Sequence, residues 1–223
     1  MTGKRTIAVM QPYFFPYLGY FRLLAACDIF VVFDDVQFPR RGRVHRCEMS
    51  PGRWLTLPLA PMPFVTLIKN LRWASDARST LDKRLAVFGL PGQATTPASE
   101  RISRHLTGPL GDVTDYLEEG LRLAADALEL EPEILRSSSI DIDPALRGQE
   151  RVISIVQALG GQRYINAPGG HGLYMAEAFR RVGVDLQFLE PYAGRFPHTL
   201  PALFGNDLTD LRDDVRSTCL WTP

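Results

Sequence analysis

The stretch TIAVMQPYFFPYLGYFRLLAACDIFVVFDD, residues 6–35, decides the fold of this chain. It starts with a short apolar run and ends with a second one, each of which is typical of a buried strand. The segment between them carries apolar residues at helical spacing, at Leu18, Phe21, Leu24 and Ala25. Two apolar strands joined by a helix predict a parallel βαβ crossover with both sheet faces covered, because an antiparallel hairpin needs no helix.

The remaining sequence continues this alternation. Strand-like or helical patterns follow at 53–59, 76–90, 109–130, 133–141, 150–160, 163–166 and 176–192. Residues 92–132 begin with a linker-like stretch and continue with a long amphipathic pattern. The sequence therefore predicts one α/β domain over residues 1–223, with a three-layer, mostly parallel, Rossmann-like sheet and a helical insertion near 92–132.

The amino-acid composition argues against several classes of function. Lys plus Arg and Asp plus Glu balance at 25 each, so we expect no nucleic-acid partner, which would favour a basic chain. The three cysteines are far apart and odd in number. They form neither a disulfide framework nor a metal-ligand spacing, so we expect no metal site. The residues alone identify no cofactor.

Apolar runs in this chain are short. The first one, TIAVM at 6–10, is too short for the core of a signal peptide. No run approaches the roughly 18 residues that a membrane span requires. We therefore expect a cytoplasmic protein without a membrane span.

The loops that leave parallel strands meet at one edge of a sheet, where ligands bind. The first such loop, residues 11–20, carries four residues that we predict to bind substrate, namely Gln11, Tyr13, Tyr17 and Tyr20. Gln11 closes a buried strand and needs hydrogen-bond partners there. Alternatively, some of the rings in this loop only pack the top of the first helix.

The second such loop begins with Asp34 and Asp35, which we take as candidate catalytic residues. Neighbours at a strand end point to opposite faces, so the two carboxyl groups are not expected to share a proton. General base catalysis, binding of a ligand amine, metal binding and a purely structural turn all remain open for them. Gln37 follows on the same loop and is predicted to bind substrate.

A basic run follows, with arginines at 40, 41, 43 and 46 and a histidine at 45. Guanidinium groups bind carboxylate or phosphate in a bidentate manner, and we predict Arg41 and Arg46 as substrate-binding residues. His45 joins the two aspartates as a third catalytic candidate. The alternative for a charge run of this kind is a solvated loop.

The third such loop leaves the strand at 163–166 and reads NAPGGHGLY. Its glycines present backbone N–H groups that suit an anion, although the loop matches neither a Walker motif nor a full GxGxxG fingerprint. We predict Asn166 and His171 as substrate-binding residues. A solvated histidine is the alternative for position 171.

Several motifs together resemble the WbqC-like family. They are QPYFFPYLGYF (11–21), Asp28 with Phe30, DDVQF (34–38), Arg40 with Arg41, and WLTLP (54–58). The resemblance covers nearly the whole chain, and QP-LGYF with DDVQF is specific to the family. Two departures stand out: HRCE at 45–48 replaces a common N-R-N-R run, and Ala202 replaces an aspartate.

A second, weaker resemblance concerns the fold. The order of strand, P-x-x-x-x-L-G-Y helix, strand and V-Q-F is similar to the HxGH nucleotidylyltransferases, pantothenate synthetase among them. Their two histidines would fall at Tyr17 and Tyr20, which carry no positive charge. The resemblance implies that variant of the Rossmann-like fold and argues against nucleotide activation.

The WbqC-like resemblance implies a biosynthetic transferase in surface-polysaccharide or specialised metabolism. The expected reaction moves an acyl or aminoacyl group onto an amine or amino sugar. The partners would be a small-molecule donor, in one version held on a carrier protein, and the acceptor. The alternatives are an ATP-dependent ligase or nucleotidylyltransferase-like enzyme, and a non-catalytic accessory binding subunit.

Overall fold

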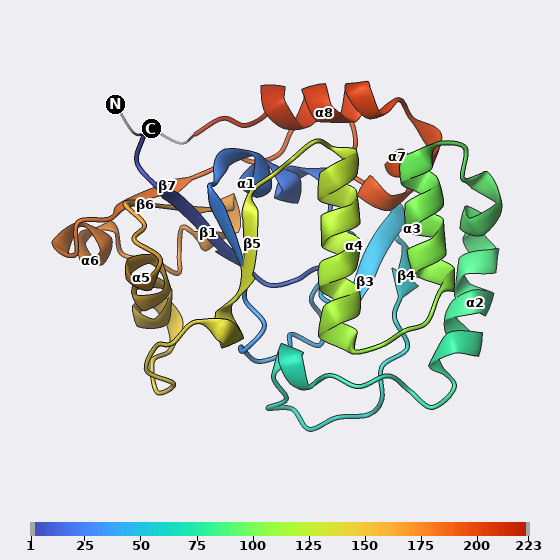
Figure 1. The fold of residues 1–223 in the computed structure, drawn as a ribbon, viewed down its shortest axis with the longest axis horizontal. Helices are drawn as coiled ribbons and strands as arrows, with labels where there is room; N and C mark the ends of the chain where they lie inside the picture. Colours follow the sequence, from blue (N-terminus) through green and yellow to red (C-terminus); the bar gives the residue numbers. More distant parts are fainter. Residues whose placement is uncertain (1–2, 222–223) are drawn as a thin grey trace.

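The computed structural model describes residues 3–221, and a five-stranded parallel sheet lies at its centre (Figure 1). The spatial order of the strands is β5-β2-β1-β6-β7. Their bounds are β1 Thr6–Met10, β2 Ile29–Val32, β5 Glu133–Arg136, β6 Arg163–Asn166 and β7 Asp185–Phe188. The predicted parallel βαβ crossover is confirmed, because β1 pairs with β2 in parallel, with Ile7 opposite Ile29.

Successive side chains of each strand enter different cores, as the pleat requires. Ile7 and Val9 pack with the helices of one face, whereas Ala8 belongs to the larger core on the other. Helices α5 (Gly148–Ala158) and α6 (Ala176–Arg181) cover the first face. In Figure 1 they lie to the left of the sheet, with α4 (Val113–Ala127) to its right. The predicted three-layer α/β architecture is confirmed.

The direction of the crossovers reverses in the middle of the sheet. From β1 the chain moves outward through β2 to β5, and it then returns to the other side of β1 to add β6 and β7. The reversal leaves a switch point between β1 and β6. Loops diverge there at the carboxyl ends of the strands, and open α/β sheets bind their ligands at such a point.

A large segment connects β2 to β5. It contains an antiparallel hairpin and several of the helices on the right of Figure 1. The elements are β3 Arg46–Ser50, β4 Arg53–Thr56, η2 Ile68–Asn70, α2 Ala77–Phe88, η3 Leu90–Gln93, α3 Pro97–Thr107 and α4 Val113–Ala127. Helices α3 and α4 fall within the predicted insertion at 92–132, while the hairpin and α2 precede it.

The aromatic loop after β1 is anchored by buried rings. Phe15 adopts a φ of 40°, a left-handed conformation that is costly for a bulky side chain. Its buried ring packs against His105 of α3 at 6.3 Å between centroids, which holds the turn in place. Phe14 packs beside it at 5.2 Å. These two rings therefore fill the structural role that was the alternative for this loop.

The last part of the chain closes over the start of α1 (Phe21–Ala26), which follows η1 (Leu18–Tyr20). The buried guanidinium of Arg22 donates to the carbonyl oxygens of Glu190 at 2.8 Å and Thr218 at 2.6 Å. A charged side chain tolerates such burial only when its N–H groups are satisfied. The remaining elements are η4 Ser137–Ser139, η5 Pro168–Gly170, α7 Thr199–Gly205 and α8 Leu208–Ser217. Within residues 3–221, none of the helices has the length and apolar character to cross a membrane.

Candidate ligand site

A cavity of about 450 Å³ opens at the switch point of the sheet. It lies at the carboxyl ends of β1 and β6, where the topology places a ligand. Its size suits a small molecule. The lining residues are Val9, Met10, Gln11, Tyr13, Tyr17, Tyr20, Phe33, Arg43, Asn166, Ala167, Gly169, Gly170, Leu173 and Tyr174.

Tyrosine rings from the first loop form one wall of the cavity. Tyr13 and Tyr20 lie 5.3 Å apart between ring centroids, and Tyr17 lines the same space. The Tyr20 hydroxyl donates to the Gln11 carbonyl oxygen at 2.8 Å, which fixes the start of the loop. The side-chain amide of Gln11 has no hydrogen-bond partner within residues 3–221. It is therefore available to a ligand.

Burial raises the pKa of Tyr13 and of Tyr17 above the ordinary value, although the nearby Arg43 guanidinium opposes the shift for both. Both phenols are therefore protonated at neutral pH. They serve as hydrogen-bond donors and as apolar surface rather than as bases.

Arg43 supplies the only charged side chain in the lining within the described part of the chain. Its guanidinium lies over the rings of Tyr17 at 5.7 Å and Trp54 at 5.0 Å, which orients it across the wall. Glu48 approaches to 3.8 Å, a long ion pair that leaves much of the charge available. The Phe14 N–H donates to the carbonyl oxygen of Arg43 at 3.2 Å and so ties the basic run to the aromatic loop.

Asn166 contributes a second carboxamide from the end of β6. Its side chain is buried, and its oxygen accepts the Ala167 N–H at 2.7 Å. Its NH₂ group has no partner among residues 3–221 and therefore remains free to donate. Gly170 leaves room for this amide, because a Cβ at that position would lie 2.5 Å from Asn166 Nδ2 and would displace it.

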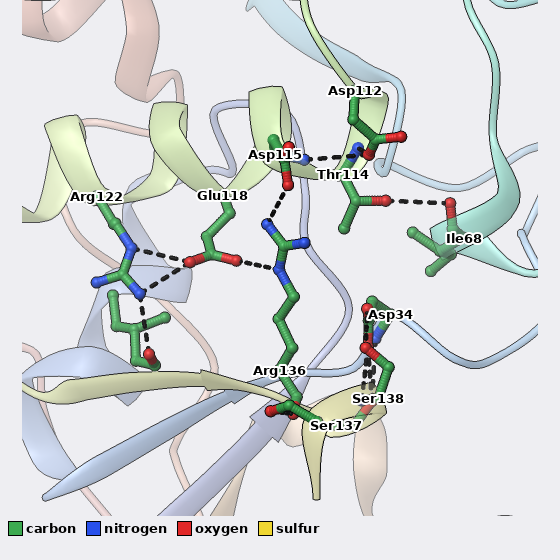
Figure 2. A network of polar contacts seen from close by, with 12 residues as sticks. Asp34, Ile68, Asp112, Thr114, Asp115, Glu118, Arg122, Arg136, Ser137 and Ser138 are labelled. Carbon is green, nitrogen blue, oxygen red and sulfur yellow. Dashed lines mark hydrogen bonds and ion pairs between the residues drawn. The ribbon is translucent and has the colours of Figure 1, made fainter.

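Asp34 and Asp35 lie outside this lining. Buried Asp34 accepts from Ser137 Oγ at 3.0 Å, and from the Ser138 N–H at 3.0 Å and Oγ at 2.6 Å (Figure 2). Asp35 accepts from Ser137 Oγ at 2.6 Å and forms an ion pair with Arg151 of α5. The two carboxylates thus hold the loops after β2 and β5 together.

The other predicted residues are also separate from the cavity. Gln37 is exposed and donates to the Phe64 carbonyl oxygen at 2.9 Å. Arg46 donates to the carbonyl oxygens of Gly42 at 3.1 Å and Arg41 at 2.6 Å, so it folds the basic loop on itself. His45 lines a second cavity, Arg41 is exposed, and His171 stacks on Phe188 at 3.9 Å.

The structure thus brings together Gln11, Tyr13, Tyr17, Tyr20 and Asn166. The remaining predicted residues lie outside this lining, and their roles in catalysis and binding stay predictions. Arg43 is not predicted as a binding residue from the sequence, although it lies within the basic run. Which arginine of a loop faces a cavity depends on the path of the loop backbone, and the sequence does not give that path. Tyr174 closes the glycine-rich loop and lines the cavity, whereas the sequence predicts only Asn166 and His171 of that loop as binding residues.

An ion network fastens α4 to β5 (Figure 2). Arg136 donates to Glu118 at 2.5 Å and to Asp115 at 2.7 Å, and Glu118 also accepts from Arg122 at 2.8 Å. Each charge has a partner, so the network serves as a structural clamp. Nowhere in residues 3–221 do three or more His, Cys, Asp or Glu side chains gather as metal ligands would.

The structure is that of an α/β protein with a cavity at the switch point of a Rossmann-like sheet. The model of the WbqC-like protein family matches residues 11–209, and the chain belongs to that family. It is also similar to Rv1507c of Mycobacterium tuberculosis, which is described as uncharacterized. The two are 34% identical over 208 residues, 83% of this chain and 82% of the relative. No solved structure matches the chain. Membership in the family suggests a biosynthetic role.

Proposed function

We propose that this protein is a biosynthetic transferase that joins an acyl or aminoacyl group to a small amine or amino sugar bound in the switch-point cavity. The supporting observation is the lining itself, in which Arg43 is the charged group among tyrosine rings and two carboxamides. One guanidinium suits one phosphate or carboxylate group on the ligand. Flat aromatic walls suit a sugar or another ring.

Each wall has a separate role in this proposal. Arg43 binds the anionic group, such as the phosphate of a nucleotide-linked sugar. Tyr13 and Tyr17 donate hydrogen bonds from protonated hydroxyls, consistent with their raised pKa values. The amides of Gln11 and Asn166 orient polar groups of the acceptor.

The chemistry assigned to the site relies on positioning. In acyl transfer from a thioester, the C–N bond forms as the C–S bond breaks, and the amine proton passes to the thiolate or to water. A neutral amine and an activated donor react without a strong base when they are held in contact. The donor is a small thioester or the same group on a carrier protein. The proposal assigns no proton transfer to Asp34 or Asp35, whose carboxylates are engaged elsewhere.

One observation favours a second candidate, a non-catalytic binding subunit of a biosynthetic complex. The lining contains no carboxylate, histidine or cysteine within the described residues. A protein that only presents a ligand to a partner enzyme needs none of these groups. The strand order is also compatible with a nucleotidylyltransferase-like or ATP-dependent ligase reaction, which the test therefore includes as an outcome.

The test pairs binding with product formation. Thermal unfolding is measured with nucleotide-linked amino sugars, ATP and an acyl thioester, on the native protein, Arg43→Met and the matched control Arg41→Met. We expect a nucleotide-linked amino sugar to raise the melting temperature of the native protein and of Arg41→Met, but not of Arg43→Met.

Mass spectrometry of the mixture with thioester then separates the candidates. An N-acylated sugar supports the transferase. Binding without any product supports the accessory subunit, and turnover that requires ATP supports the ligase. If no amino sugar binds, or Arg43→Met binds as well as the native protein, the proposed function is wrong.

A further inference from the structure

A second cavity, of about 390 Å³, lies between the basic run, the segment after β4 and α2. Its walls combine apolar side chains with three nitrogen-bearing ones. The residues on which the argument depends are Phe38, Arg40, His45, Leu57, Met62 and Arg84. It is distinct from the switch-point cavity, with which it shares no lining residue.

The two guanidinium groups of this cavity are each held by a single backbone acceptor. Arg40 donates to the Met62 carbonyl oxygen at 2.6 Å, and Arg84 donates to the Thr56 carbonyl oxygen at 2.5 Å. Within residues 3–221, neither has a carboxylate within 4.0 Å. Two positive charges thus meet at one cavity, with most of their N–H groups unused.

His45 adds an imidazole ring to the lining. Its Nδ1 atom is buried and has no hydrogen-bond partner among the described residues, a condition that is costly and uncommon. Its ring packs edge-on against Phe38 at 5.1 Å between centroids, which fixes its plane. Burial, together with Arg46 and Arg84, lowers the pKa of His45, as expected for an imidazole in positive surroundings.

We propose that this second cavity binds an organic phosphate, with the phosphate held by Arg40, Arg84 and His45 and its apolar body held against Phe38, Leu57 and Met62. Three nitrogen-bearing side chains, two from the basic run and one from α2, suit a dianion with several oxygens better than a carboxylate. The volume suits a small molecule rather than a lone ion. The site is independent of the proposed reaction, so either proposal can fail without the other.

The experiment uses phenyl phosphate as the probe, with inorganic phosphate and benzoate as comparison ligands. Isothermal titration is run on Arg43→Met, so that the switch-point cavity contributes no anion site, and then with Arg84→Met, Arg40→Met or the matched control Arg41→Met added. We expect phenyl phosphate to bind more tightly than either comparison ligand. Loss of Arg84 or Arg40 should weaken it about tenfold, and loss of Arg41 by less than about twofold.

A local readout accompanies the titration. The chain has four histidines, so the imidazole signals of His45 can be assigned by nuclear magnetic resonance with the His45→Gln variant. Phenyl phosphate should shift those signals and raise the pKa of His45, since the bound anion favours the imidazolium. Because Arg84→Met also removes a bond to the hairpin, Arg84→Lys, which keeps the charge, should give an intermediate affinity. Unmoved His45 signals, equal affinity for benzoate, or unchanged affinity in both arginine variants would overturn the proposal.

Discussion

The Asp35 carboxylate forms an ion pair with the Arg151 guanidinium of α5, and both side chains are less than a tenth exposed. The ion pair links the loop after β2 to α5, one of the two helices that cover the first face of the sheet. Removing one partner of a buried pair leaves an uncompensated charge, whereas removing both is far less harmful. We therefore expect the Asp35 carboxylate to stabilise the folded protein.

Asp35→Asn should lower the free energy of unfolding by about 3 kcal/mol, because it leaves the Arg151 charge buried without its counter-ion. Urea unfolding measures the loss. The double variant Asp35→Asn with Arg151→Met should be less destabilised than the sum of the single variants. Asp185→Asn is the control, since it removes an exposed pair with Lys4 and should cost less than about 1 kcal/mol. A variant that keeps its stability but loses turnover would return Asp35 to the catalytic residues.

Gly19→Ala should destabilise the protein by about 2 kcal/mol. A Cβ at position 19 would lie 2.6 Å from Tyr17 Cε2 and 2.6 Å from Tyr192 Cβ, so the aromatic loop and the later segment would separate. The comparison is Gly172→Ala, where the added Cβ meets no atom within 4 Å. Equal melting temperatures for the two variants would contradict this account.

His105 makes stability depend on pH. Burial lowers its pKa to about 4, below its ordinary value of 6.5, beside the Tyr116 ring at 4.1 Å. The unfolded chain therefore binds a proton that the folded chain does not. Its contribution to stability is complete above pH 6.5 and is lost as the pH falls toward 4.

The measurement is the free energy of unfolding from pH 7 to pH 4. In His105→Phe, the slope of this decline with pH should be smaller by the amount that corresponds to the uptake of about one proton. An unchanged slope in His105→Phe would show that other groups take up the proton.

Arg22→Met should cost about 3 kcal/mol, because it leaves the Glu190 carbonyl oxygen without its side-chain donor and removes one of the two donors to the Thr218 carbonyl oxygen, which also accepts the Leu220 N–H at 2.9 Å. Limited proteolysis should then cleave the segment after 190 before the sheet. Arg216→Met, which changes an exposed arginine, is the control. Loss of stability without earlier cleavage after residue 190 would mean that Arg22 supports the helix alone.

The sequence was sufficient to predict the central sheet and part of the lining of the switch-point cavity. Continuous apolar runs at 6–10 and 29–33 predict the central strands, and the rule of carboxyl-end loops brings Gln11 and Asn166 to one site. The hydrogen-bond and ion-pair partners of Asp34 and Asp35 could not be predicted from the sequence. They are serines and an arginine about a hundred residues away, brought near by the return of the chain through β5 and α5. A choice among Arg41, Arg43 and Arg46 likewise depends on the path of one loop.

The central position of β1 has a consequence for the protein during its synthesis. One edge of β1 is covered as soon as β2 follows, but its other neighbour, β6, begins at Arg163, about 150 residues after β1 ends. At ribosomal speeds of about 5–20 residues per second, that edge stays unpaired for roughly ten seconds or more. The nascent chain thus exposes an apolar strand edge for most of its translation. We expect a chaperone that binds such edges to bind this protein early in its synthesis.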